Sequence, residues 1–171
     1  EETTAIAKAM FLSSNWNLVD EGRLSYEEIE QIFVDSCPAY ADDIRLVFAH
    51  FGDCITHFPY TRHWISSLKQ QGYQVYYLSN YGDFTCQYTR KDLDFCDLMD
   101  GGVMSYEVKC LKPDPVIYQN LFEKYHLKPE ECVFIDDNAA NIDAAKKLWM
   151  KTILFQDYFQ AQKQLNVLCN K

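Results

Sequence analysis

The sequence has few basic residues and no long apolar run, and both absences exclude classes of protein. Its 171 residues include 16 Lys and Arg against 25 Asp and Glu, which gives a formal net charge of −9 at pH 7. A chain without a basic patch cannot displace the counterions of a phosphate backbone, so we expect no nucleic-acid partner. The apolar runs are short, and the first residues lack the basic-then-apolar pattern of a signal peptide, so we expect no membrane span and a cytoplasmic protein.

Metal and redox motifs built on cysteine and histidine are absent as well. The seven cysteines form an odd set without a CxxC pair, and the four histidines fall in no HExxH arrangement. We therefore expect most cysteines to be reduced, buried packing residues and the histidines to be structural. With 48% hydrophobic and 15% aromatic residues, the chain can fill one core or a core with a small appendage.

The first third of the chain, residues 1–58, predicts helices with polar breaks and no strand. Ser25 and Glu28 have the spacing of a capping box, and the apolar face that follows stops before Pro38. The pattern supports a small helical bundle, and a lid over a site is the functional alternative. Because the chain begins with Glu1 and not with Met, we expect it to start inside a longer gene product.

The rest of the chain is organised around the segment 132–155. An apolar run ends in Asp136 and Asp137, Asn138 follows as a candidate helix cap, and a second apolar run covers 152–155. This pattern predicts a β-α-β unit with the two carboxylates at the carboxyl end of a buried parallel strand. Adjacent carboxylates there repel each other unless a cation such as Mg²⁺ neutralises them, and helix capping is the alternative role.

Two further loops carry polar groups that suit phosphate chemistry. A strand predicted over 74–79 ends in Ser79 and Asn80. Lys112 precedes a helix that Asp114 and a proline at position 115 are expected to start, so its ammonium lies near a positive helix end. A solvated Lys112 is the alternative. A hydroxyl, an ammonium and a Mg²⁺ site together provide what a phosphoryl-transfer transition state requires.

These segments together resemble the haloacid dehalogenase-like (HAD) hydrolase superfamily, in its helical-cap phosphatase branch. Leu78-Ser79-Asn80 is similar to the second motif of that family and Lys112 in Lys-Pro-Asp-Pro to the third. Phe134-Ile-Asp136-Asp137 with Asn141 is similar to the fourth. The resemblance implies an α/β fold, a Rossmann-like parallel sheet flanked by helices, with residues 1–58 as a small α-helical cap and 59–171 as the core.

The resemblance also implies an activity and a role for each motif residue. Ser79 and Lys112 would hold the transferring phosphoryl group with help from Asn80. Asp136 would bind Mg²⁺, and Asp137 would bind it directly or through water. The implied reaction is Mg²⁺-dependent hydrolysis of a small phosphorylated metabolite through an aspartyl-phosphate.

The sequence departs from the family pattern in three places. Lys109 and Trp149 stand where the family usually has glycine, and we expect Trp149 to reshape packing under the sheet. More importantly, no strand before residue 59 ends in Asp-x-Asp, the first motif, which carries the nucleophile and the acid/base residue. The core strand between the Ser79 and Asp136 strands is then missing too, which would leave two strand edges open.

Three hypotheses explain the missing motif. In order of preference, the chain lacks an N-terminal segment of a normal enzyme, or it is a repacked pseudo-enzyme, or another chain lends the strand in a strand-sharing homodimer. The rival functions are a non-catalytic binding or scaffold protein with the same fold, and a haloacid dehalogenase. A dehalogenase needs no Mg²⁺, so the Asp136-Asp137 pair favours a phosphatase.

Overall fold

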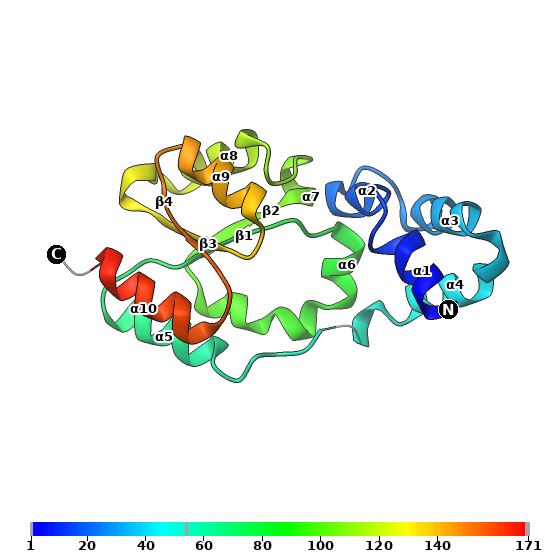
Figure 1. The fold of residues 1–171 in the computed structure, drawn as a ribbon, viewed down its shortest axis with the longest axis horizontal. Helices are drawn as coiled ribbons and strands as arrows, with labels where there is room; N and C mark the ends of the chain where they lie inside the picture. The colour runs from blue at the N-terminus through cyan, green and yellow to red at the C-terminus, as the bar shows by residue number, and fades with distance from the viewer. Residues whose placement is uncertain (1, 54, 170–171) are drawn as a thin grey trace. The chain divides into compact units, whose positions relative to one another are not determined.

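The computed structural model describes residues 2–53 and 55–169 as a mixed α/β protein in which helices predominate (Figure 1). It divides into two compact units, Glu1–Leu111 and Lys112–Lys171. The α/β class expected from the sequence is confirmed. The division into a cap over 1–58 and a core over 59–171 stays a prediction.

The first unit contains most of the helices and one pair of strands. Its α-helices are α1 Glu2–Met10, α2 Trp16–Glu21, α3 Tyr26–Ser36, α4 Ala41–Ala49, α5 Thr61–Gln70, α6 Asp83–Tyr88 and α7 Ser105–Val108. Its 3-10 helices are η1 Pro38–Tyr40, η2 Phe51–Asp53 and η3 Arg90–Leu98. Strands β1 Tyr76–Ser79 and β2 Gly101–Met104 pair in parallel, with Ser79 opposite Met104.

The capping box at the start of α3 is formed as the sequence predicts. The Glu28 N–H donates to the Ser25 hydroxyl at 3.2 Å, and the Ser25 N–H donates to the Glu28 carboxylate at 2.8 Å. Both bonds satisfy N–H groups that the helix itself leaves without partners. Within the described part of residues 1–58, every regular element is a helix, as expected.

An aromatic-rich core holds the helices of the first unit together. Its buried members are Met10, Val19, Ile29, Phe33, Val34, Ile44, Phe48, Phe51 and Phe84. Phe84 belongs to α6, beyond the predicted cap, and its ring lies 5.5 Å from that of Tyr26 at an interplanar angle of 85°. The helices of residues 1–58 therefore share one core with α6, which follows β1.

Hydrogen bonds among Asp20, Tyr81 and Ser105 form a clasp that joins the end of α2 to α7. The buried Ser105 hydroxyl donates to the Asp20 carbonyl at 2.5 Å and accepts the Tyr81 N–H at 2.8 Å. At Gly22, which has a φ of 59°, an added Cβ would lie 2.7 Å from the Cβ of Tyr106. Gly22 is thus required both for the left-handed turn that ends α2 and for its close approach to α7.

We predict that Ser105→Ala lowers the free energy of unfolding by about 2 kcal/mol, because the Tyr81 N–H would be left buried without a partner. Urea unfolding measures the change. Ser13→Ala is the control and should cost less, because within the described residues the Ser13 hydroxyl bonds only to the Met10 carbonyl. Equal effects of the two substitutions would contradict the clasp.

The second unit is a β-α-β unit with helices packed on it. Its elements are α8 Pro115–Tyr125, η4 Pro129–Glu131, β3 Val133–Asp136, α9 Ala139–Lys147, β4 Lys151–Leu154 and α10 Tyr158–Cys169. Strands β3 and β4 are parallel, with Asp136 opposite Leu154, and α9 packs on both (Figure 1). The strand–helix–strand order predicted from the sequence is confirmed.

One edge of β3 has no partner strand in the described residues. The Phe155 N–H donates to the Asp136 carbonyl at 2.9 Å, so the peptide groups of Asp136 face β4. Because peptide groups alternate along a parallel ladder, those of Val133 and Ile135 face the opposite edge. Each of the two sheets has two strands within the described ranges. Within the described ranges, no strand therefore pairs with the edge of β3 at which a strand is expected to be missing.

The two residues that replace family glycines both adopt left-handed backbone conformations. Lys109 has a φ of 54° and Trp149 a φ of 69°. The Lys109 ammonium donates to the Gly22 carbonyl, so this side chain takes part in the clasp. Trp149 is 82% exposed, which shows that the expected packing under the sheet is wrong. The departures lie where a side chain is strained, because only glycine adopts this conformation without a steric penalty.

We predict that Trp149→Gly raises the free energy of unfolding by about 1 kcal/mol. Glycine relieves the steric penalty, and the exposed Trp149 side chain buries little surface that could be lost. Lys147→Gly, an exposed change two residues earlier inside α9, should lower it by about 0.5 kcal/mol. Thermal unfolding of both variants checks the opposite signs, and destabilisation by Trp149→Gly would refute the strain.

The cysteines differ in one respect from the sequence expectation. Six are free and half-buried: Cys37, Cys86, Cys96, Cys110, Cys132 and Cys169. Full burial is therefore wrong for these six, and Cys54 lies outside the described residues.

None of the helices in the described ranges combines the length and apolar character needed to cross a bilayer.

Candidate active site

The end of β3 and the start of α9 place two carboxylates and a helix cap side by side in sequence. The apolar residues of β3 stop at Asp136, and α9 starts at Ala139. The Asn138 side chain accepts the Ala140 N–H at 2.9 Å, so Asn138 caps the helix as predicted. The alternative in which Asp136 and Asp137 serve only as the cap is therefore unnecessary.

Asp136 lies at the centre of a dense set of hydrogen bonds. One carboxylate oxygen accepts the Lys112 ammonium at 2.7 Å. The other accepts the Asn141 side-chain N–H at 3.0 Å and the Asn138 backbone N–H at 2.8 Å. The side chains of Lys112 and Asp136 are only 10% and 7% exposed. A buried carboxylate with three donors is held in one orientation.

Lys112 is a buried ion-pair partner and not a solvated surface residue, so that alternative is wrong. Asp114 accepts the Val116 N–H at 2.9 Å and caps α8, as the sequence predicts. Lys112, two residues earlier, also lies 5.6 Å from the centre of the Phe134 ring. Its ammonium is thereby held between an aromatic face and the carboxylate at the end of β3.

Asp137 differs from its neighbour. It is exposed, and within the described residues it has no hydrogen bond or ion pair. Its carboxylate is therefore the one that can bind a cation without first breaking a protein contact.

These donors fit Mg²⁺. Mg²⁺ binds oxygen and is usually held by one or two carboxylates with waters and substrate phosphate, so Asp137 with its neighbour Asp136 is a sufficient protein contribution. Among the described residues, no group of three or more His, Cys, Asp or Glu side chains offers a self-contained metal cage. A site of this kind would depend on the substrate or on another protein segment for its remaining ligands.

The structure brings some of the predicted residues together within one unit, and the others belong to the other unit. Lys112, Asp136 and Asn141 meet within the second unit. Ser79 is the last residue of β1 in the first unit and Asn80 follows it, both half-buried. The carboxyl end of a parallel strand is where α/β proteins bind ligands, as predicted for Ser79. Convergence of Ser79 and Asn80 on Asp136 stays a prediction.

Sequence reasoning missed one residue of this network, Tyr118. Its hydroxyl donates to the Asn141 carbonyl at 2.9 Å, and the side chain is fully buried. In the sequence it is one of several apolar or aromatic positions on the inner face of α8, and nothing distinguishes it from a packing residue. Asn141 belongs to the fourth motif, but the motif alone implies no separate role for it.

Three of the half-buried thiols are poor candidates for an alternative nucleophile. Burial raises the pKa of Cys96 to about 11, and burial also raises the pKa of Cys86 and of Cys132. The thiolate is the reactive form, so these three cysteines are protonated and unreactive near pH 7.

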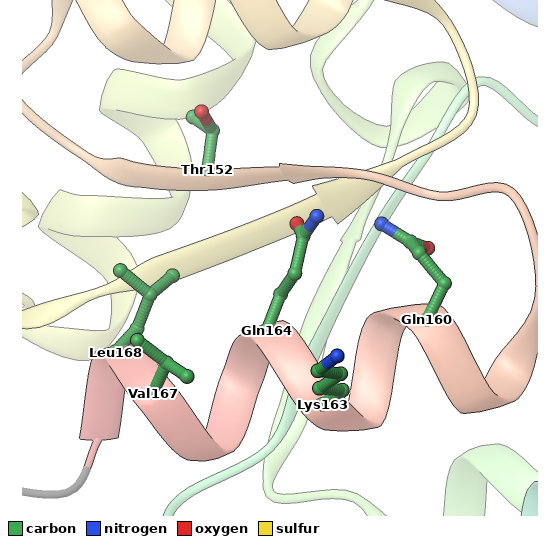
Figure 2. Close-up of a pocket in the computed structure, with 6 residues that line it drawn as sticks. All are labelled: Thr152, Gln160, Lys163, Gln164, Val167 and Leu168. Carbon is green, nitrogen blue, oxygen red and sulfur yellow. The ribbon is translucent and has the colours of Figure 1, made fainter.

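A cavity of about 530 Å³ lies elsewhere in the second unit, between α10 and β4 (Figure 2). It is lined by Thr152, Gln160, Lys163, Gln164, Val167 and Leu168. Figure 2 shows that the five side chains other than Thr152 come from α10. The cavity contains none of the predicted site residues and only one charged side chain, so it lacks the groups for acid, base or nucleophilic chemistry.

Comparison with known proteins agrees with this geometry. The family model of haloacid dehalogenase-like hydrolases matches residues 6–148, which is most of the chain. The chain therefore belongs to the haloacid dehalogenase-like hydrolase family, a family of enzymes, as its motifs indicate.

Relatives with different activities are similar to the chain. D-ribitol-5-phosphate phosphatase of Bacteroides thetaiotaomicron is 29% identical over 110 residues, 59% of this chain and 52% of the relative. (S)-2-haloacid dehalogenase 4A of Burkholderia cepacia is 29% identical over 99 residues, 58% of this chain and 43% of the relative. The chain thus spans about half the length of these two relatives.

A solved structure shows the same fold. A HAD family enzyme of Bacteroides thetaiotaomicron, in complex with magnesium and inorganic phosphate, matches with a TM-score of 0.71 at 22% identity. The match covers 91% of this chain and 82% of that one.

We predict that Lys112→Met lowers the free energy of unfolding by about 3 kcal/mol, because Asp136 would stay buried without its counter-charge. In the Lys112→Met background, Asp136→Asn should lower the free energy of unfolding much less than it does when Lys112 is present, because the two side chains act as a pair. Urea unfolding of the single and double variants measures this coupling. Lys128→Met, which breaks an exposed ion pair with Glu131, is the control and should leave stability unchanged. Additive effects of Lys112→Met and Asp136→Asn would contradict the pairing.

Proposed function

We propose that this chain is the larger part of a Mg²⁺-dependent phosphatase that hydrolyses a small phosphate ester. The observation that carries the proposal is the buried Lys112–Asp136 pair at the end of β3, next to the exposed Asp137. A cation-binding carboxylate beside a fixed ammonium suits a ligand with negative oxygens, and a phosphate ester has them. The similarity to a ribitol-phosphate phosphatase supports the same choice.

Each residue has a separate role in this proposal. Asp137, with Asp136 beside it, would hold Mg²⁺, which neutralises charge on the phosphoryl oxygens when bound. Lys112 would contact a phosphoryl oxygen while Asp136 keeps its ammonium in place. Ser79 and Asn80 would donate hydrogen bonds to the same group from the first unit. These roles follow the family motifs, and the contacts around Asp136 support them.

The proposed reaction also needs an attacking carboxylate, and none of the residues with these roles supplies it. A carboxylate oxygen would form a bond to phosphorus while the ester oxygen leaves with a proton, and water would then hydrolyse the resulting aspartyl-phosphate. The open edge of β3 supports the view that a further strand belongs beside Asp136. We propose that this strand carries the Asp-x-Asp motif and belongs to the same protein. A strand lent by a second copy in a homodimer is the alternative.

Two other functions stay open as alternatives. A non-catalytic binding protein would keep the Lys112–Asp136 pair and Mg²⁺ without turnover. A haloacid dehalogenase is favoured by the relative from Burkholderia cepacia, but the exposed Asp137 beside Asp136 would then have no cation to bind. A cytoplasmic location and a small phosphorylated metabolite as substrate complete the proposal.

We predict that the 171-residue chain binds inorganic phosphate in the presence of Mg²⁺ and does not turn over p-nitrophenyl phosphate. Fusing an apolar strand that ends in Asp-x-Asp to its N-terminus should restore turnover, because the nucleophile and the strand are supplied together. Asp137→Asn should abolish both the Mg²⁺-dependent binding of phosphate and the Mg²⁺-dependent turnover. Calorimetry measures binding, and release of p-nitrophenolate measures turnover.

The control for this experiment is Asp143→Asn, which neutralises another exposed carboxylate, the one that pairs with Lys146 on α9. It should change neither reading. Phosphate binding without restored turnover would favour the binding protein. Metal-independent release of halide from a 2-haloacid by the fused chain would favour the dehalogenase. Absence of phosphate binding in both chains would overturn the proposal.

A further inference from the structure

Tyr118 is a buried polar residue whose hydroxyl the proposed reaction does not use. Its side chain is fully buried in α8, and its ring lies 5.4 Å from that of Phe134 in β3 at 73°. A phenylalanine would fill the same space without burying a hydroxyl, whose burial is unfavourable unless it forms a hydrogen bond. The hydroxyl group therefore has a use that packing does not explain.

The partner of this hydroxyl connects it to the candidate site. The Tyr118 hydroxyl donates to the backbone carbonyl of Asn141 at 2.9 Å, and the Asn141 side chain donates to Asp136 at 3.0 Å. The direction of the first bond is fixed because a carbonyl only accepts. Burial and the charge of Asp136 raise the pKa of Tyr118, so the hydroxyl keeps its proton at any working pH. Asn141 is thus held by its backbone and holds Asp136 with its side chain.

The consequence reaches the neighbouring carboxylate through the backbone. Asp136 also accepts the Asn138 N–H at 2.8 Å, so the peptide groups on both sides of Asp137 belong to one hydrogen-bonded turn. With its backbone fixed, Asn141 holds the Asp136 carboxylate through its side chain, and Asp136 in turn holds this loop. The loop determines where the Asp137 carboxylate points. Groups that orient ligands in this way commonly change metal affinity by 10- to 100-fold.

We propose that Tyr118 is a positioning residue, which fixes the loop 136–141 for metal binding through its hydrogen bond to the Asn141 carbonyl. The inference rests on the proposed function, because it assumes that this loop binds Mg²⁺. Tyr118 itself touches neither metal nor substrate in this proposal. It acts from α8, the helix that follows Lys112, so the same segment fixes Asp136 directly through Lys112 and indirectly through Asn141.

The test removes only the hydroxyl. Tyr118→Phe keeps the ring and should weaken Mg²⁺ binding about 10-fold in calorimetry. It should also speed hydrogen exchange of the Asn138 amide at least threefold in the absence of metal. Tyr158→Phe is the matched control, because it also removes one tyrosine hydroxyl, and that hydroxyl accepts a hydrogen bond from the Gln162 side chain within α10. It should leave Mg²⁺ affinity and Asn138 exchange within twofold of the original chain.

A double variant separates positioning from a general loss of stability. In an Asn141→Ala background, the side-chain link to Asp136 is already gone, so Tyr118→Phe should weaken Mg²⁺ binding by less than twofold further. A merely structural role would give the same tenfold loss of Mg²⁺ affinity in both backgrounds, and this result would overturn the proposal. Unchanged Mg²⁺ affinity and unchanged Asn138 exchange in Tyr118→Phe would overturn it as well.

The exchange measurement also distinguishes this inference from the proposed function. If the original chain binds no Mg²⁺, the proposed function fails, and Asn138 exchange without metal decides whether Tyr118 fixes the loop. Unchanged exchange in Tyr118→Phe would then overturn the positioning role as well.

Discussion

The buried ion pair between Lys112 and Asp136 is the interaction on which the second unit depends. Neither charge is tolerable alone at 10% and 7% exposure, so each residue keeps the other in place. The pair ties the segment before α8 to the end of β3, two parts of the chain separated by 24 residues. The rest of the unit follows from this constraint, since α8 must begin where the preceding Lys112 reaches Asp136, and α9 must begin where Asn141 reaches it.

The same constraint gives the two adjacent carboxylates, Asp136 and Asp137, different roles. Asp136 accepts three donors and serves as an internal anchor, whereas Asp137 is exposed and has both oxygens available. A sequence motif with two identical residues thus becomes two different chemical groups, because one side chain points into the hydrogen-bonded turn and the other does not. Burial and partners, not residue type, set the properties of a carboxyl group.

Much of this arrangement could be predicted from the sequence because it is local. The capping box at Ser25, the caps at Asp114 and Asn138, and the abrupt end of an apolar strand at Asp136 are short-range patterns with a direct physical meaning. Tyr118 could not be predicted, because its role depends on a contact with a backbone carbonyl 23 residues away. The exposure of Trp149 could not be predicted for a related reason, since it depends on a left-handed turn.

The open edge of β3 has a consequence for how this polypeptide behaves in solution. An edge that has no partner strand in the described part of the chain, beside apolar side chains, can pair with the same edge of another molecule, which begins sheet-mediated aggregation. At pH 7 the net charge of −9 opposes such encounters by mutual repulsion. That repulsion vanishes near the isoelectric point of about 4.8, so mild acidification removes the colloidal protection of the edge.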